Sequence, residues 1–105
     1  MTTFDDREKS IENRYVNREE FRFKVEARRN KLLGLWAAEL MGKSGDSADA
    51  YAKEVIASDF EEAGDNDVLR KVYGDVQAAG LSVTREEVRQ RMDALLAEAE
   101  KQLQG

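Results

Sequence analysis

The chain has no cysteine, no histidine and no proline among its 105 residues. Without cysteine it has neither a disulfide framework nor a thiolate metal site. Without histidine it lacks the side chain that proteins use most often as a general base and as a metal ligand. Proline breaks helices, so its absence, together with 37% charged residues, favours a mostly helical chain. Composition therefore makes an enzyme a weak hypothesis.

The sequence also lacks an excess of basic residues and long apolar runs. Its formal net charge is −5, which argues against a general nucleic-acid binder. No stretch is long and apolar enough to span a bilayer, and the N-terminus has no signal-like apolar region. We therefore expect one cytoplasmic domain that does not insert into a membrane.

The densest apolar segment lies between residues 32 and 41 and contains the only tryptophan, Trp36. Its apolar residues fall on nearly every side of a helix, which predicts a central helix that other helices pack around. Three basic residues, Arg28, Arg29 and Lys31, come just before it. They are interpreted either as a solvated helix end or as a docking patch.

Four helices are predicted from apolar spacing and from the glycines that follow the first three, Gly42, Gly64 and Gly80. The expected apolar stripes are Phe21, Val25, Leu32, Leu35, Trp36 and Leu40; Ala48, Tyr51, Ala52, Val55, Ile56 and Phe60; Val68, Leu69, Val72, Tyr73, Val76 and Ala79; and Val88, Met92, Leu95, Leu96, Ala99 and Leu103. Gly34 lies inside the first helix, where it would allow a neighbouring helix to approach closely. Short connections predict antiparallel neighbours.

Polar residues before these stripes are candidate helix caps. The candidates are Ser44 or Asp46, Asp65 or Asp67, and Thr84 with Glu87 three residues later as a capping box. The predicted fold is all-α, a four-helix bundle over residues 21–105 with a mobile N-terminal arm over residues 1–20.

The arm prediction rests on a thin apolar stripe. Phe4, Ile11 and Tyr15 are spaced by seven and four residues, which fits one face of a helix but is too narrow to hold the segment firmly on a core. We expect residues 1–20 to be loosely held when free and helical on a partner.

Charge is unevenly distributed between the first two core helices. Residues 21–43 carry six basic and two acidic side chains, whereas residues 44–67 carry one basic and eight acidic ones. One interpretation is that the two segments pack against each other. The other is a bipolar surface that orients the protein on a larger partner.

Two short segments resemble ligand-binding motifs but lack their required parts. Gly42-Lys43-Ser44 resembles the end of a phosphate-binding loop, yet the earlier glycine of that motif is replaced by Ala37. Asp65-Asn66-Asp67 lacks the glycine and distal glutamate of a calcium loop. No metal or cofactor is therefore predicted from the residues.

Longer segments carry a family resemblance. Met1-Thr2-Thr3-Phe4-Asp5-Asp6-Arg7-Glu8 and Ala27-Arg28-Arg29-Asn30-Lys31-Leu32-Leu33-Gly34-Leu35-Trp36-Ala37-Ala38-Glu39 resemble the alphaproteobacterial ATP synthase inhibitor subunit zeta. The resemblance continues through Asp49-Ala50-Tyr51-Ala52-Lys53-Glu54-Val55 and Asp59-Phe60-Glu61-Glu62. The chain departs from the family pattern at Val16-Asn17-Arg18, where many members have Ala-His-Asp.

The resemblance implies a regulatory protein that is not an enzyme. Its bundle would dock on the catalytic head of the F-type ATP synthase, formed by the alpha, beta and gamma subunits, at the inner membrane. Its arm would enter an inter-subunit cleft and block rotation in the hydrolysis direction. The implied apolar anchors are Phe4, Ile11 and Tyr15, and the implied polar contacts are Asp5, Asp6, Arg7 and Arg14.

Two other functions remain open from the sequence. The chain could be an adenine-nucleotide-binding regulatory module, with Arg28, Arg29 or Lys31 on the phosphates near Trp36. It could also be a plain helical adaptor for another complex.

Overall fold

The computed structural model describes the backbone of residues 3–59 and 64–104, and the side chains of residues 19–59 and 64–104. Within these residues helices are the only regular secondary structure, and turns or irregular segments connect them. The helices are α1 (Thr3–Leu40), α2 (Gly45–Ser58), α3 (Asn66–Ala78) and α4 (Arg85–Gln104). This result confirms the predicted all-α class and the four predicted helices.

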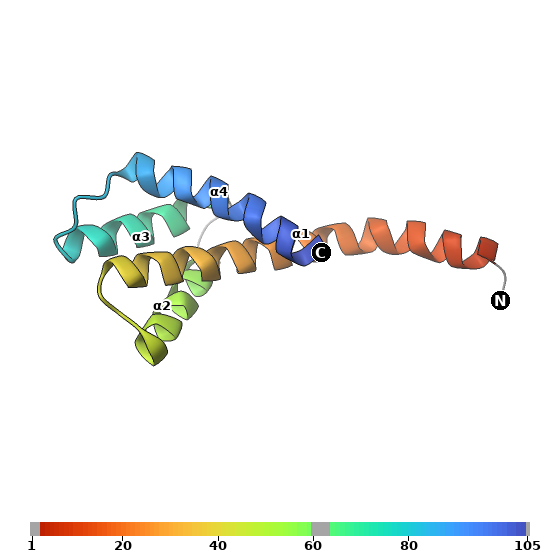
Figure 1. The fold of residues 1–105 in the computed structure, drawn as a ribbon. Coiled ribbons are helices and arrows are strands. Elements are labelled where there is room, and N and C mark those ends of the chain that lie inside the picture. The colour runs from red at the N-terminus through yellow and green to blue at the C-terminus, as the bar shows by residue number, and fades with distance from the viewer. Residues whose placement is uncertain (1–2, 60–63, 105) are drawn as a thin grey trace.

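Helix α1 organises the molecule. Its 38 residues correspond to about 57 Å at the usual helical rise, close to the 61 Å length of the long axis. Figure 1 shows α2, α3 and α4 gathered along the C-terminal half of α1, while the N-terminal half extends away from them. Helix α1 contacts each of the other three helices, as expected for a central helix with apolar residues on several sides.

The predicted boundary between arm and bundle does not coincide with a helix end. Helix α1 begins at Thr3 and continues through residues 20 and 21 to Leu40. The predicted arm and the first core helix are therefore parts of one continuous helix (Figure 1). The mobility of residues 1–20 stays a prediction.

The core lies where α1 meets the other helices. The buried cluster consists of Leu33, Ala37, Ala38, Tyr51, Val55, Val68, Leu69, Val72, Val76, Val88 and Met92. Trp36 is partly buried and packs against this cluster. Leu40, predicted as part of the apolar stripe, is 39% exposed in the last turn of α1. The predicted stripe therefore extends beyond the part of α1 that is buried. Phe60, predicted for the second stripe, lies outside the described residues.

Helices α1 and α2 approach each other most closely at Gly34. A methyl group built there would lie 2.6 Å from the Cα atom of Ala52. Because this neighbour is backbone, it cannot rotate away as the end of a long side chain could. The predicted close approach at Gly34 is confirmed, and α2 is the helix that makes it.

Gly34→Ala is expected to destabilise the protein by about 1–3 kcal/mol, although alanine is the better helix former, because α2 must shift. Gly74→Ala is the matched control, since nothing lies within 4 Å of a methyl group at that helical glycine. The control should stabilise the protein by about 0.5–1 kcal/mol. Denaturant unfolding followed by circular dichroism measures both. Equal shifts for the two variants would contradict the close-packing account.

Local capping signals end and begin the helices largely as predicted. Gly42 has φ +77°, and the backbone N–H groups of Gly42 and Lys43 donate to the carbonyl oxygens of Glu39 and Ala38. This is the double hydrogen bond of a Schellman motif, which stops α1. At α4, the Glu87 backbone N–H donates to Thr84 Oγ1 at 3.1 Å, and the Thr84 N–H donates to Glu87 Oε1 at 3.4 Å. The predicted capping box is therefore confirmed.

The N-caps of α2 and α3 are at predicted positions but lack the predicted bond. Ser44 and Asp65 occupy these positions, and neither side chain makes a capping hydrogen bond. Asp65 instead turns toward α1 and α4, where it takes part in the polar network described next.

Candidate functional site

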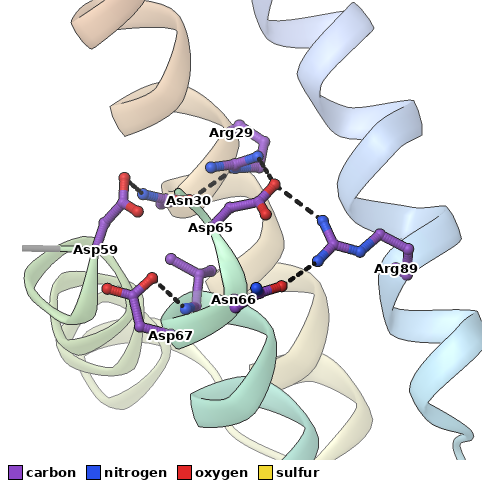
Figure 2. A network of polar contacts seen from close by, with 8 residues as sticks. Arg29, Asn30, Asp59, Asp65, Asn66, Asp67 and Arg89 are labelled. Atoms are coloured by element: carbon purple, nitrogen blue, oxygen red, sulfur yellow. Dashed lines mark hydrogen bonds and ion pairs between the residues drawn. The ribbon is translucent and has the colours of Figure 1, made fainter. Parts of the chain in front are cut away.

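A polar network joins α1, α4 and the connection between α2 and α3. Its members in the described part of the chain are Arg29 and Asn30 of α1, Asp59, Asp65 and Asn66 around the connection, and Arg89 of α4 (Figure 2). The network lies among helices that are distant in sequence, so its contacts depend on the folded bundle.

Arg29 is the most buried cation of this network. Only 3% of the residue is exposed, and its Nε donates to Asn30 Oδ1 at 2.7 Å. Its terminal guanidinium nitrogen lies 3.5 Å from Asp65 Oδ2. A buried cation is stable only when its hydrogen bonds and charge are compensated, and both partners supply that compensation.

Asp65 is the hub of the network. Its Oδ2 accepts from Arg89 at 2.9 Å as well as from Arg29, so one carboxylate bridges α4 and α1. The other terminal nitrogen of Arg89 donates to Asn66 Oδ1 at 3.0 Å. Asn30, which is 1% exposed, donates to Asp59 Oδ2 at 3.0 Å. These bonds attach both ends of the α2–α3 connection to α1, as Figure 2 shows.

The network is suited to holding helices together. Among the described residues, every buried side-chain nitrogen and oxygen atom has a hydrogen-bond partner, so the network presents no unsatisfied buried donor to a ligand. The same part of the chain contains no group of three or more carboxylates placed to hold a metal ion. The geometry therefore indicates a structural role for Arg29 and Asp65.

A second polar cluster joins α2 and α3. The hydroxyl of Tyr51 donates to Asp75 Oδ2 at 2.8 Å, and Lys71 lies 3.0 Å from Asp75 and 3.2 Å from Glu54. Burial, followed by the bond to Asp75, raises the pKa of Tyr51 well above its usual range. Burial opposes protonation of Lys71, but its hydrogen bonds to Asp75 and Glu54 outweigh that effect and raise its pKa.

The raised pKa of Tyr51 predicts a loss of stability in alkali. In the unfolded chain this phenol ionises near pH 10, whereas the folded protein keeps it neutral. The contribution of Tyr51 to the free energy of unfolding is therefore complete below about pH 10 and falls as the pH rises above that value. Tyr51→Phe should remove this loss, up to about 1.4 kcal/mol per pH unit. Lys71, whose pKa is also raised, adds a loss of its own in alkali to both proteins, so the prediction concerns a smaller loss in Tyr51→Phe and not a flat profile. Tyr73→Phe is the control, and unfolding curves at pH 9 to about 11.5 test the prediction. If the free energy of unfolding falls with pH equally in wild type and Tyr51→Phe, the prediction is wrong.

Four residues were predicted to contact a docking partner or a nucleotide: Arg28, Arg29, Lys31 and Trp36. The structure places them in different surroundings, and Arg29 is the buried member of the polar network described above. Arg28 is exposed and donates to Gln102 of α4 at 3.0 Å, and Lys31 is also exposed. Trp36 lies on another part of α1, with the guanidinium of Arg91 5.2 Å from its ring centroid. No hydrogen bond, ion pair or ring contact in the described part joins Trp36 to the three basic residues. Their binding role stays a prediction.

The predicted arm contacts cannot be placed in the same way. The side chains of Phe4, Asp5, Asp6, Arg7, Ile11, Arg14 and Tyr15 lie outside those that the structure describes. Only the helical backbone of residues 3–18 is described, as the first half of α1.

Contacts within the bundle explain part of the uneven charge between residues 21–43 and residues 44–67. The acidic connection after α2 contacts α1 through the Arg29–Asp65 ion pair and the Asn30–Asp59 hydrogen bond. The predicted contact between the basic and acidic segments thus forms at the connection. From the sequence, Asp65 was considered as a helix cap and as part of a rejected calcium loop, and its ion pair with Arg89 was missed. The pairing of residues 24 positions apart depends on how α3 and α4 pack.

The fold and the network define a small helical protein whose described polar clusters hold helices together. Its sequence matches the family model of ATPase inhibitor subunit zeta over residues 1–102, and the chain belongs to this family. It is also similar to a protein whose structure was determined by solution NMR. The two chains are 56% identical with a TM-score of 0.70, over 78% of this chain and 93% of the other. Comparison with curated proteins gave no match.

Family membership confirms the resemblance on which the functional expectation was based. It supports the role of an ATP synthase inhibitor, a regulatory protein that interacts with the ATP synthase. In the described part of the chain, none of the helices combines the length and apolar character that a membrane span requires.

Proposed function

We propose that the chain inhibits ATP hydrolysis by the F-type ATP synthase through residues 1–19 of its N-terminal arm. This arm inserts at the catalytic inter-subunit cleft of the head and contacts the alpha, beta and gamma subunits. There it blocks rotation in the hydrolysis direction. The observation that carries the proposal is the family match, which includes the arm as well as the bundle.

The course of α1 supports insertion of the arm. Residues 3–20 alone provide about 27 Å of helix at the usual rise, enough to reach below the surface of a large partner. Every residue of the buried apolar core lies at Val25 or later in the described part of the chain. The arm can therefore engage a partner without removing a described side chain from the core.

The arm residues have the composition that binding requires. Phe4, Ile11 and Tyr15 recur at helical spacing and would bury apolar area, which must offset the entropy of ordering the arm. The polar contacts would come from Asp5, Asp6, Arg7 and Arg14. The protein would act at the cytoplasmic face of the inner membrane, bound peripherally through the ATP synthase.

Nucleotide binding has less support as an alternative. It would use Arg28, Arg29 or Lys31 near Trp36, but Arg29 is buried against Asp65 and Asn30. A phosphate would have to displace Asp65 from this guanidinium. The adaptor alternative predicts no effect on ATP hydrolysis, so the experiment below separates it.

The test measures both directions of the enzyme. Inverted membrane vesicles that contain the cognate ATP synthase without its own zeta subunit are assayed for ATP hydrolysis and, under a proton gradient, for ATP synthesis. The proposal predicts that added protein suppresses hydrolysis and leaves synthesis nearly unchanged. Equal loss in both directions would contradict one-way blocking, and no effect on either would favour an adaptor.

A further inference from the structure

A groove lies between α1 and α4, beside the point where the described side chains of α1 begin. It has a volume of about 590 Å³. Its apolar floor is formed by Phe21, Val25 and Leu96. Val25 is buried at the edge of the apolar core, whereas Phe21 and Leu96 are only partly buried. Phe21 and Leu96 therefore leave apolar surface accessible in the groove.

Among the residues whose side chains the structure describes, the lining of this groove is mainly acidic. Glu19, Glu26 and Glu100 line it, and within this described lining Arg22 is the one cation. Glu19 and Glu100 are exposed, whereas Glu26 is partly buried. An apolar floor with a negative rim fits an apolar side chain flanked by lysine or arginine.

The position of the groove relates it to the arm. Residue 19 is at the base of the proposed inhibitory arm, and Figure 1 shows the end of α4 beside the middle of α1. When the arm enters a cleft, the surface at its base faces the rim of that cleft. A contact there would add binding area without requiring a further conformational change.

We propose that the α1/α4 groove is a docking surface for an apolar and basic segment of the catalytic head of the ATP synthase. This inference rests on the proposed function and assigns a part of the bundle to the same complex. The head segment contributes an apolar side chain to the floor and one or more cations to the acidic rim.

Charge reversal at the rim tests this proposal in the full-length protein. Glu26→Lys combined with Glu100→Lys, two lining residues outside the arm, should weaken binding to the purified head, prepared without its own zeta subunit, by about tenfold at low ionic strength. The difference from wild type should shrink at high salt. Arg22→Gln should strengthen binding, because it removes a cation from the described lining of the groove.

A matched control separates a local effect from a change in net charge. Glu39→Lys combined with Glu98→Lys makes the same change in net charge at exposed positions on the same two helices, and neither residue lines the groove. It should alter the dissociation constant by less than about twofold. Thermal unfolding of each variant shows whether the bundle is intact.

The outcomes distinguish the groove from the proposed function. If wild type inhibits hydrolysis but the groove variant binds like the control, docking at the groove is wrong while the arm mechanism stands. If charge reversal tightens binding and Arg22→Gln weakens it, the partner is anionic and the proposal is overturned. If wild type neither binds nor inhibits, both proposals fall.

Discussion

Asp65→Ala is expected to lower the free energy of unfolding by about 2–3 kcal/mol. Removing one partner of a buried ion pair typically costs about 3–5 kcal/mol, and the one-third exposure of the Asp65 side chain reduces that value. The loss arises because Arg29 stays buried without this carboxylate, while Arg89 loses its bond to the same oxygen. Urea unfolding at neutral pH measures it.

Arg29→Met provides the informative comparison. This substitution removes the buried charge itself and keeps a side chain of similar length, so it should cost only about 1 kcal/mol. The double variant should lose less stability than the sum of the losses in the two single variants, since each substitution removes part of the same interaction. Asp93→Ala, at an exposed position of α4, is the control and should change stability by less than about 0.5 kcal/mol.

The opposite ranking would refute the hub assignment. If Arg29→Met costs more than Asp65→Ala and the two losses are additive, Arg29 stabilises the protein through packing of its aliphatic stem. The Arg29–Asp65 contact would then contribute little.

Replacing the three arm anchors is expected to weaken inhibition of ATP hydrolysis about 100-fold or more. Phe4→Ser, Ile11→Ser and Tyr15→Ser together remove the apolar stripe of the arm, and buried apolar anchors dominate the binding energy of most interfaces. The stability of the bundle should hardly change, because the described core begins at Val25. Inhibition titrations and thermal unfolding, performed on the same preparations, measure both quantities.

The control uses the opposite side of the arm. Helical spacing places Lys9, Asn13 and Asn17 away from the anchor stripe, and Lys9→Ser, Asn13→Ser and Asn17→Ser match the number of substitutions. They should reduce inhibition less than the anchor variant does. Equal losses would show that the anchors have no special part in the interaction.

Local sequence signals predicted the helices and several of their ends. Gly42 and the pair Thr84 with Glu87 act within a few residues of themselves, so a sequence pattern is sufficient to identify them. The close approach at Gly34 was also predictable, because a glycine inside a strong helix needs a packing reason. Its partner Ala52 was not predictable, since that contact depends on how α1 and α2 cross.

Contacts between distant residues limited the prediction of the site. Arg29 and Asp65 are 36 positions apart, and each could equally be solvated in an unfolded or differently packed chain. The Asp65 side chain could either cap α3 or pair with a cation. Tertiary packing determines that it pairs with Arg29 and Arg89. The α1/α4 groove depends in the same way on where the end of α4 lies along α1.

The central claim is that residues 1–19 carry the inhibition while the rest of the chain folds without them. The most direct test is steady-state ATP hydrolysis by the cognate head lacking its own zeta subunit, with either the full-length protein or residues 20–105 added. The account predicts inhibition by the full-length protein alone, and cooperative unfolding of the shorter chain. Full inhibition by residues 20–105 would contradict it and would place the function in the bundle.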